Sequence, residues 1–193
     1  MTDTSVPVRF DFKIIVAGAF AVGKTTLIAA ISDEQVVGTE VGTSGAEASV
    51  KETTTVGMEY GTFAVGGDDV EVELNLFGVP GQPRFSFMWD IVSQGMDALL
   101  LLVDAQRPET WTEALGVGRH FRRQRHVPVV VAINRTDDVD AAVAAIQAEV
   151  PIEGAHYVTC DPRDTESARA AVIEVLYLLL DQLEDDEGET GDG

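Results

Sequence analysis

Cysteine and positive charge are both scarce in this chain of 193 residues. Cys160 is the only cysteine, which excludes an internal disulfide and a multi-cysteine metal site and favours a reducing compartment. Basic residues number 13 against 33 acidic ones, for a net charge of −20. A field of that sign repels nucleic-acid phosphates and anionic lipid headgroups. We therefore expect no nucleic-acid partner.

Long hydrophobic runs are also lacking. The longest apolar run, Ala98 to Val103, has the length of a strand and falls far short of the roughly 20 residues that cross a bilayer. The first residues do not combine a basic stretch with an apolar run, and the last ones hold no prenylation cysteine. We therefore expect a cytoplasmic protein with no direct membrane insertion.

The composition is that of a single globular domain. Hydrophobic residues make up 45% of the chain and charged residues 24%, which is enough to build a core. We expect the domain to span residues 8–183, after a short N-terminal extension over 1–7. Residues 184–193 are acidic without basic partners, and we expect them to form a disordered tail.

Apolar segments alternate between strand-like and helix-like patterns. The patterns predict strands over 8–17, 58–65, 70–77, 98–104, 127–134 and 155–160, and helices over 24–31, 109–125, 138–149 and 165–183. The second and third strands flank the turn Gly66–Asp69 and should form an antiparallel hairpin. Residues 33–55 show no clear periodicity, so we expect a long functional loop. The sequence thus predicts an α/β fold with a six-stranded, mostly parallel sheet and helices on both faces.

A phosphate-binding loop stands between the first strand and the first helix. Its sequence, G-A-F-A-V-G-K-T over Gly18–Thr25, fits every fixed position of the GxxxxGK[ST] motif of P-loop NTPases. Glycines let the backbone approach phosphates, the lysine supplies a charge, and the hydroxyl of Thr25 can bind magnesium. The expected phosphate-binding residues are Gly18, Ala19, Phe20, Ala21, Val22, Gly23, Lys24, Thr25 and Thr26. Phe20 is unusual in such a loop. Its ring either crowds the attacking water or an arginine finger, or it packs on a neighbouring segment.

A second motif, N-R-T-D over Asn134–Asp137, follows the strand predicted over 127–134. It is similar to the guanine-reading NKxD motif, with arginine in place of lysine. The carboxylate of Asp137 can accept hydrogen bonds from both N1–H and the exocyclic amine of guanine. Asn134 would brace the phosphate loop, and the stem of Arg135 could lie over the base.

With both motifs in place, the chain from Phe10 to Leu183 resembles the Ras-like small GTPases. The resemblance implies GTP and GDP as ligands, Mg²⁺ as cofactor, and a G domain that switches between two nucleotide states. It implies that Thr25 and Thr55 serve the metal and that Lys24 and Gln82 are catalytic, Gln82 by orienting the hydrolytic water. Further contacts implied by the resemblance are Gly81 with the terminal phosphate, and the backbone of Cys160 and Asp161 with the base.

Gly78 departs from the family pattern, because it replaces the aspartate that normally holds magnesium through water. With Pro80 and the segment Phe87–Asp90, this change resembles the bacterial branch of conservon-associated and MglA-type GTPases. Such a resemblance implies a Roadblock/LC7-type regulatory protein and a sensor-kinase-like membrane protein as partners, which could recruit the chain to a membrane. We also expect weak metal retention and slow, partner-stimulated hydrolysis in bacterial signal transduction.

Two other functions fit the sequence. Leu99–Asp104 looks like a Walker B strand, in which case Asp104 would hold magnesium in a P-loop ATPase. Alternatively, the chain is a nucleotide-loaded interaction module with negligible hydrolysis, as Phe20 and Gly78 suggest. Phe85, Phe87, Met88 and Trp89 follow Gln82, and we expect a mixture of packing and partner contact from them.

Overall fold

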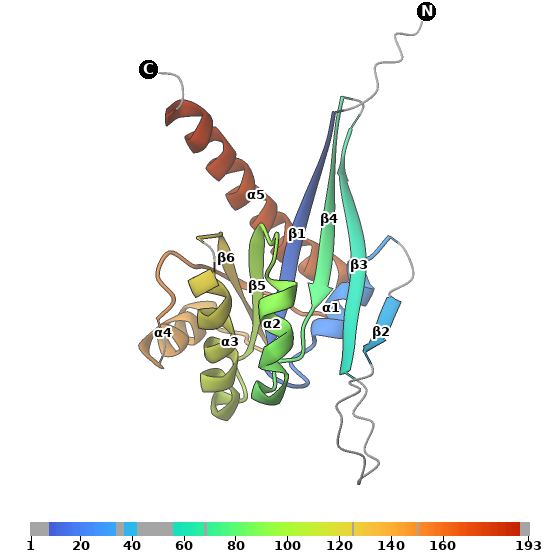
Figure 1. Cartoon of the computed structure of the whole chain (residues 1–193). Helices are drawn as coiled ribbons and strands as arrows, with labels where there is room; N and C mark the ends of the chain where they lie inside the picture. Colours follow the sequence, from blue (N-terminus) through green and yellow to red (C-terminus); the bar gives the residue numbers. More distant parts are fainter. Residues whose placement is uncertain are drawn as a thin grey trace, which may run out of the picture.

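Seven strands form one mixed sheet in the computed structural model, which describes residues 8–33, 37–41, 56–67, 69–124, 126–149 and 151–189 (Figure 1). Their order across the sheet is β2-β3-β4-β1-β5-β6-β7. The strands are β1 Val8–Gly18, β2 Val37–Val41, β3 Val56–Gly66, β4 Val70–Gly78, β5 Ala98–Asp104, β6 Val129–Asn134 and β7 His156–Thr159. β1 pairs in parallel with β4 and β5, β5 with β6, and β6 with β7, whereas β2–β3 and β3–β4 are antiparallel.

The predicted α/β fold class is confirmed, and all of the predicted strands are present. The sheet gains a seventh strand because β2 lies inside the segment that the sequence predicts as a loop. β2 pairs with the outer edge of β3 through backbone groups. Such edge pairing depends on backbone hydrogen bonds more than on side-chain periodicity, which explains why the pattern did not indicate it.

Five α-helices accompany the sheet in the described part of the chain: α1 Lys24–Ile31, α2 Ser86–Val92, α3 Trp111–Gln124, α4 Val139–Glu149 and α5 Thr165–Glu189. The sequence did not predict α2, which is too short to show a helical period. α5 continues past Leu183, where we expected the tail to begin, and residues 190–193 lie outside the described residues. None of the described helices has the length and apolar character that a membrane span requires.

The helices cover both faces of the sheet and enclose two hydrophobic cores. α1 and α5 pack on one face, and α2, α3 and α4 lie on the other (Figure 1). Alternate residues of β1 point into different cores: Ile14 and Val16 face α1 and α5, whereas Ile15 and Ala17 face α3. Every residue of β5 is buried, as expected for a central parallel strand covered on both sides.

The carboxyl ends of the parallel strands meet at one edge of the sheet. β1 ends at the phosphate loop, β4 at Gly78, β5 at Asp104 and β6 at Asn134. Ligands of open α/β sheets bind at this edge. The fold therefore brings the two predicted motifs and the segment around Gln82 to one side of the molecule.

Candidate functional site

The phosphate loop has the backbone geometry that its glycines predict. Gly18 (φ +143°) and Gly23 (φ +113°) adopt positive φ angles, and a Cβ on Gly18 would lie 2.4 Å from the carbonyl oxygen of Leu102. Ala21 also has a positive φ, 59°, which is uncommon for a residue with a side chain. The loop leads directly into α1, so its backbone N–H groups lie at a helix N-terminus, where anions are favoured.

Lys24 is buried beneath this loop. Its Nζ donates hydrogen bonds to the carbonyl oxygens of Gly18 (3.0 Å) and Ala19 (2.9 Å). Burial lowers the pKa of the ammonium group from 10.5 to about 8, and the nearby carboxylate of Glu59 opposes that shift only in part. The loop carbonyl groups thus hold the charge in place, at the cost of its hydration.

A cavity of about 470 Å³ opens in front of the loop. It brings together the predicted phosphate-binding residues from Phe20 to Thr26 with Gly81 and Gln82. The predicted residues Gly18 and Ala19 do not line it, and they contribute their carbonyl groups to Lys24 instead. Thr55, the predicted second metal residue, lies outside the described residues.

The segment after β4 touches the phosphate loop. A Cβ on Gly81 would lie 2.1 Å from the carbonyl oxygen of Gly18, so only glycine permits this approach. Gln82 follows at the edge of the cavity, and the indole Nε1 of Trp89 anchors the segment by donating to the carbonyl oxygen of Pro80 (2.9 Å). Phe20 is 64% exposed at the cavity, which favours crowding of the site over packing on a neighbour.

Thr25, the predicted magnesium residue, contacts an acid that sequence reasoning missed. Its hydroxyl donates to Oε1 of Glu59 on β3 at 2.6 Å. Glu59 also lines the phosphate cavity. In the antiparallel ladder it lies opposite Gly78, a pairing that the predicted hairpin turn does not give.

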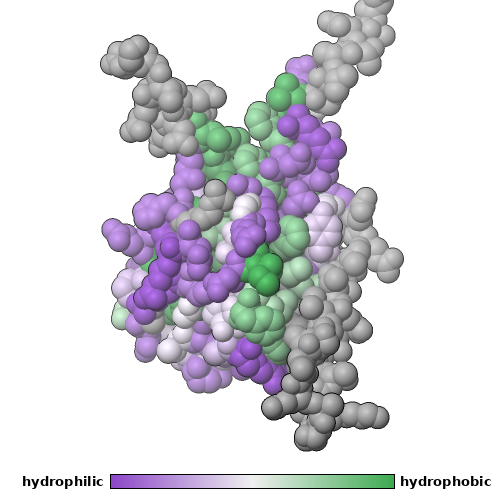
Figure 2. Space-filling view, in the orientation of Figure 1, coloured by the Kyte–Doolittle hydropathy of each residue, from purple (hydrophilic) through white to green (hydrophobic). Residues whose placement is uncertain are grey.

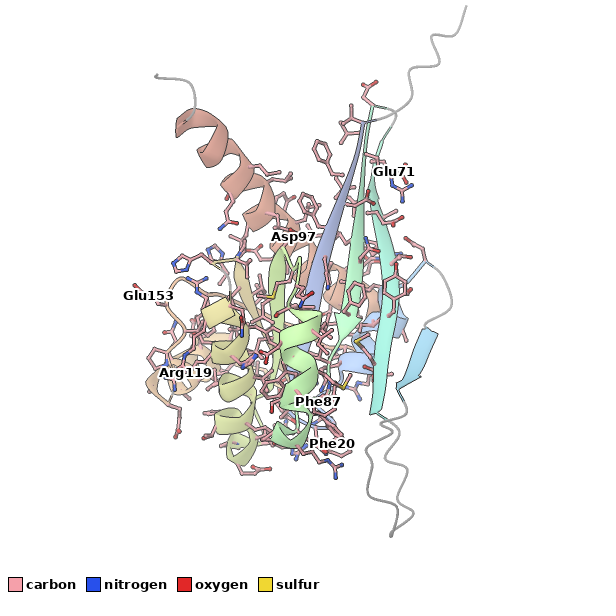
Figure 3. All side chains as sticks on the ribbon, viewed as in Figure 1. Phe20, Glu71, Phe87, Asp97, Arg119 and Glu153 are labelled. Atoms are coloured by element: carbon pink, nitrogen blue, oxygen red, sulfur yellow. The ribbon has the colours of Figure 1, made fainter. Side chains whose placement is uncertain are left out.

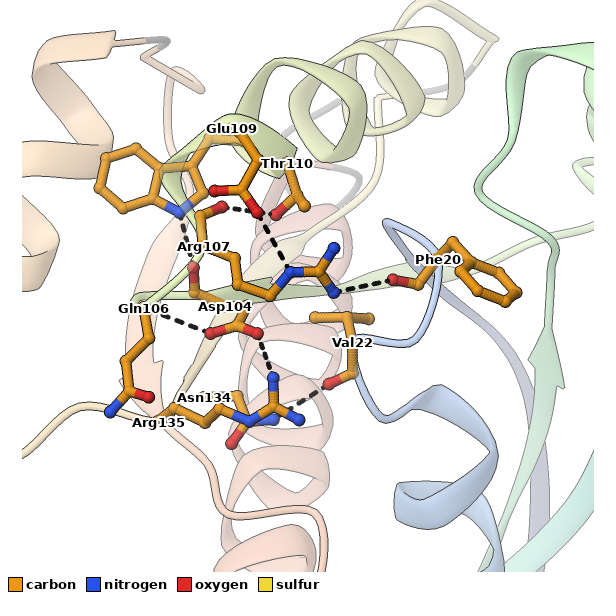
Figure 4. Close-up of polar contacts among 10 residues, drawn as sticks. Phe20, Val22, Asp104, Gln106, Arg107, Glu109, Thr110, Asn134 and Arg135 are labelled. Carbon is orange, nitrogen blue, oxygen red and sulfur yellow. Dashed lines mark hydrogen bonds and ion pairs between the residues drawn. The ribbon is translucent and has the colours of Figure 1, made fainter.

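A second cavity, of about 620 Å³, contains the predicted base-reading residues. Asn134, Arg135, Asp137, Cys160 and Asp161 all line it. The Asn134 side chain links this cavity to the phosphate loop, because its Nδ2 donates to the carbonyl oxygen of Val22 at 3.0 Å (Figure 4). The predicted bracing role of Asn134 is confirmed.

Asp104 lies at the base-reading end and contacts Arg135 (Figure 4). The carboxylate is 1% exposed, and it accepts hydrogen bonds from the guanidinium of Arg135 and from the backbone N–H of Gln106 (3.0 Å). Both of its oxygens are therefore occupied by donors. This arrangement does not support the Walker B reading, because Thr25, the predicted magnesium residue, contacts Glu59 instead of Asp104.

The last base-contact loop differs from expectation. We expected the N–H groups of Cys160 and Asp161 to face the base, but they donate to the carbonyl oxygen of Ile133 and to Oγ of Ser167, both at 2.9 Å. Hydrogen bonds from Arg163 hold the pKa of the Asp161 carboxyl below its ordinary value. The backbone N–H groups of Cys160 and Asp161 are therefore engaged in hydrogen bonds within the protein.

The aromatic run after Gln82 divides between core and surface. Met88 and Trp89 are buried, whereas Phe87 is 50% and Ile91 is 66% exposed on α2. Figure 2 shows hydrophobic surface over α2, and in Figure 3 Phe87 and Phe20 project at the same end of the molecule. The predicted packing is confirmed for Met88 and Trp89, and partner contact by the exposed residues stays a prediction.

Comparison with known proteins gives the family. The model of the Roc domain (Ras of Complex, Roc, domain of DAPkinase) matches residues 13–137, so the chain belongs to this family of Ras-like small GTPase domains. An uncharacterised protein of Methanocaldococcus jannaschii is 28% identical over 134 residues, 68% of this chain and 76% of its own. The Ras-related protein Rab-7b of Mus musculus is 27% identical, over 70% of this chain and 65% of its own. The Ras-related protein RABA5a of Arabidopsis thaliana is 23% identical, over 88% of this chain and 75% of its own.

Proposed function

We propose that this chain is a GTP-binding molecular switch that hydrolyses GTP slowly in bacterial signalling. The observation that carries the proposal is the hydrogen bond from Asn134 to Val22, which joins the phosphate cavity to the cavity that contains Asp137. A guanine nucleotide has a diphosphate and a base edge with two adjacent donors, which match these two cavities. Membership of the Ras-like family supports the same conclusion.

The chemistry follows from residues that line the phosphate cavity. The loop N–H groups and Lys24 would hold the outer phosphates and stabilise charge that develops on them. Gln82 would orient a water for in-line attack on the terminal phosphate. Thr25 and Glu59 offer a hydroxyl and a carboxylate, which are oxygen donors that suit Mg²⁺, and the metal when bound would neutralise phosphate charge. The Phe20 ring at the same cavity supports a low intrinsic rate because it limits room for the attacking water.

Thermal unfolding with GDP, GTP, ADP and ATP, each with and without Mg²⁺, tests the proposal. A ligand that binds only the folded state raises its stability, by about 2.7 kcal/mol at a hundredfold excess over Kd. We expect guanine nucleotides alone to raise the thermal midpoint. Stabilisation by adenine nucleotides would overturn the assignment of guanine as the bound base. It would favour the alternative of a P-loop ATPase in which Asp104 holds magnesium.

A nucleotide-loaded interaction module with negligible hydrolysis is the second candidate. Phe20 favours it, because a ring 64% exposed at the cavity that Gln82 also lines both obstructs the site and offers an apolar contact. Single-turnover hydrolysis of GTP distinguishes the two functions. Measurable phosphate release that a Gln82→Ala variant abolishes supports the switch, and GTP that stays intact for many hours supports the module.

We also propose the conservon-associated or MglA-type branch, with a Roadblock/LC7-type regulator as a direct partner. Exposed Phe87 and Ile91 on α2 support it, since they offer an apolar contact next to the segment that follows Gln82. A sensor-kinase-like membrane protein would recruit the otherwise cytoplasmic chain to a membrane. Co-elution with a purified bacterial Roadblock/LC7-domain protein, lost in Phe87→Ala/Ile91→Ala, would support this assignment, and no co-elution in either nucleotide state would contradict it.

A further inference from the structure

The carboxylate of Glu59 occupies the space beside Gly78, the position at which the switch II aspartate is missing. The two residues lie opposite each other in the β3–β4 ladder. A Cβ built on Gly78 would lie 2.5 Å from Oε2 of Glu59, 2.9 Å from Cδ1 of Ile28 and 3.3 Å from the Cβ of Glu59. A side chain at position 78 would therefore compete with Glu59 for the same volume.

Glu59 also contacts Thr25, the residue whose hydroxyl is expected to bind the metal. Its Oε1 lies 2.6 Å from Oγ1 of Thr25, the hydroxyl of the phosphate loop. In P-loop NTPases, magnesium is held by this hydroxyl and by a carboxylate from a neighbouring strand. Here the neighbouring strand is β3 instead of β4, but the carboxylate reaches the same hydroxyl.

The other described acids do not compete for this role. Among the described residues lining the phosphate cavity, Glu59 is the single carboxylate. Asp104 is held by Arg135 and Gln106 at the base-reading end. Within the described ranges no three His, Cys, Asp or Glu residues gather into a metal cage, which suits an ion bound by one carboxylate, a hydroxyl, phosphates and water.

We propose that Glu59 replaces the missing switch II aspartate as the carboxylate that serves Mg²⁺ in the nucleotide-bound state. This inference rests on the proposed function, because the ion binds together with nucleotide phosphates. The Thr25 hydroxyl donates to Glu59, and these two side chains would hold the ion, to which they would supply a hydroxyl and a carboxylate oxygen. The direct bond between them holds both side chains at the cavity beforehand.

Metal affinity measured apart from hydrolysis tests this role. Mn²⁺, an ion of similar ligand preference, is titrated into the GDP complex and followed by electron paramagnetic resonance. We expect Glu59→Gln to weaken Mn²⁺ binding about 10- to 100-fold, the usual effect of losing a group that orients metal ligands. GDP affinity in EDTA should stay equal or rise, because the variant removes a negative charge near the phosphates.

Two further variants sharpen the test. Glu71→Gln removes an equivalent charge at the far end of the hairpin, where Glu71 pairs with Gly66, and should leave Mn²⁺ affinity unchanged (Figure 3). The double variant Glu59→Ala/Gly78→Asp moves the carboxylate from β3 to β4. Its new Cβ requires the terminal Cδ1 of Ile28 to shift as well, and the variant should restore most of the affinity.

The outcomes separate this proposal from the function on which it rests. Wild-type Mn²⁺ affinity in Glu59→Gln would overturn the role of Glu59 while GDP binding stands. A wild-type chain that binds GDP neither with nor without metal would overturn the proposed function together with this inference. If Glu59→Gln fails to fold, the double variant decides, since recovery of Mn²⁺ binding there requires the carboxylate to act at this place.

Discussion

The two ends of the site are prepared to different degrees. At the base-reading end, Asn134 is bonded to the phosphate loop, and Arg135 is held on Asp104. At the phosphate end, the polar groups are bonded to partners that a ligand must replace: Lys24 to loop carbonyls, and the Thr25 hydroxyl to Glu59. Asn134 and Arg135 at the base-reading end are thus organised by bonds within the site, whereas Lys24 and Thr25 at the phosphate end are bonded to groups that compete with a ligand. Selection of the base should depend on fixed geometry, and metal and phosphate binding on rearrangement.

Removal of the Lys24 ammonium should have the largest effect on binding. We expect Lys24→Ala to weaken GDP binding by about 2–5 kcal/mol, because a buried charge that contacts an opposite charge is lost. Isothermal titration calorimetry measures the change. Lys13→Ala is the matched control: Lys13 lies on β1 and does not line the cavity, and its Nζ donates to the carbonyl oxygen of Gln94. Equal losses in both variants would show a general effect of charge.

Asp137→Asn should have the next largest effect, at the organised end. The variant replaces one acceptor oxygen by an amide that cannot accept, so we expect GDP affinity to fall by about 1.5–3 kcal/mol. Nucleotide competition assays would report it. Asp138→Asn is the control, because Asp138 accepts from the N–H of Ala141 at the start of α4 and asparagine can keep that cap. Unchanged guanine preference in Asp137→Asn would remove this residue from the base site.

Arg135→Ala tests whether the base-reading end is held together by the chain itself. The substitution leaves the buried Asp104 carboxylate without its guanidinium, and we expect the free energy of unfolding to fall by about 1–2 kcal/mol. That figure lies below the cost for a fully buried pair because Arg135 is 42% exposed. Urea denaturation measures it. Arg135→Lys should lose about half as much stability as Arg135→Ala. An unaltered urea midpoint in Arg135→Ala would contradict a structural role for the pair.

The pH dependence of GDP binding gives the smallest effect and is specific to the phosphate end. Burial places the pKa of Lys24 at about 8 in the free protein, and phosphates favour its charged form. Between the two pKa values the complex holds a proton that the free protein lacks, so affinity falls as pH rises. We expect about a fourfold loss from pH 7 to 8.5, with proton uptake on binding at the higher pH. Lys13→Arg should keep the uptake, and binding without proton exchange at pH 8.5 would contradict the assignment to Lys24.

The parts of the site that could be predicted from the sequence are those set by a short motif, in which each residue type is required by its position next to a strand end. Gly18 and Lys24 follow from their spacing at a strand end, and Asn134 from the motif at the end of β6. Glu59 could not be predicted from a motif, because its place opposite Gly78 depends on the register between β3 and β4. The predicted turn at Gly66–Asp69 would place Val65 opposite Val70, whereas in the structure Val65 lies opposite Val72.

Features that depend on tertiary contacts were also missed. β2 exists because β3 offers a free edge, and α2 is anchored when the buried Trp89 donates to Pro80. The N–H groups of Cys160 and Asp161 are engaged by Ile133 and Ser167, which no local pattern indicates. Long apolar segments such as β5 were placed well because burial on both faces leaves a continuous hydrophobic run.

The hydrogen bond from the Asn134 side-chain amide to the carbonyl oxygen of Val22 makes a nucleotide a bivalent ligand for this chain. The nucleoside and the diphosphate are two parts of one ligand joined by a covalent bond, and this hydrogen bond joins the two cavities that would receive them. Binding of one part then presents the other at a high effective concentration, and the affinity of the whole exceeds that of either part without new contacts. Free phosphate and free guanosine, which lack the covalent bond, should compete poorly for either cavity.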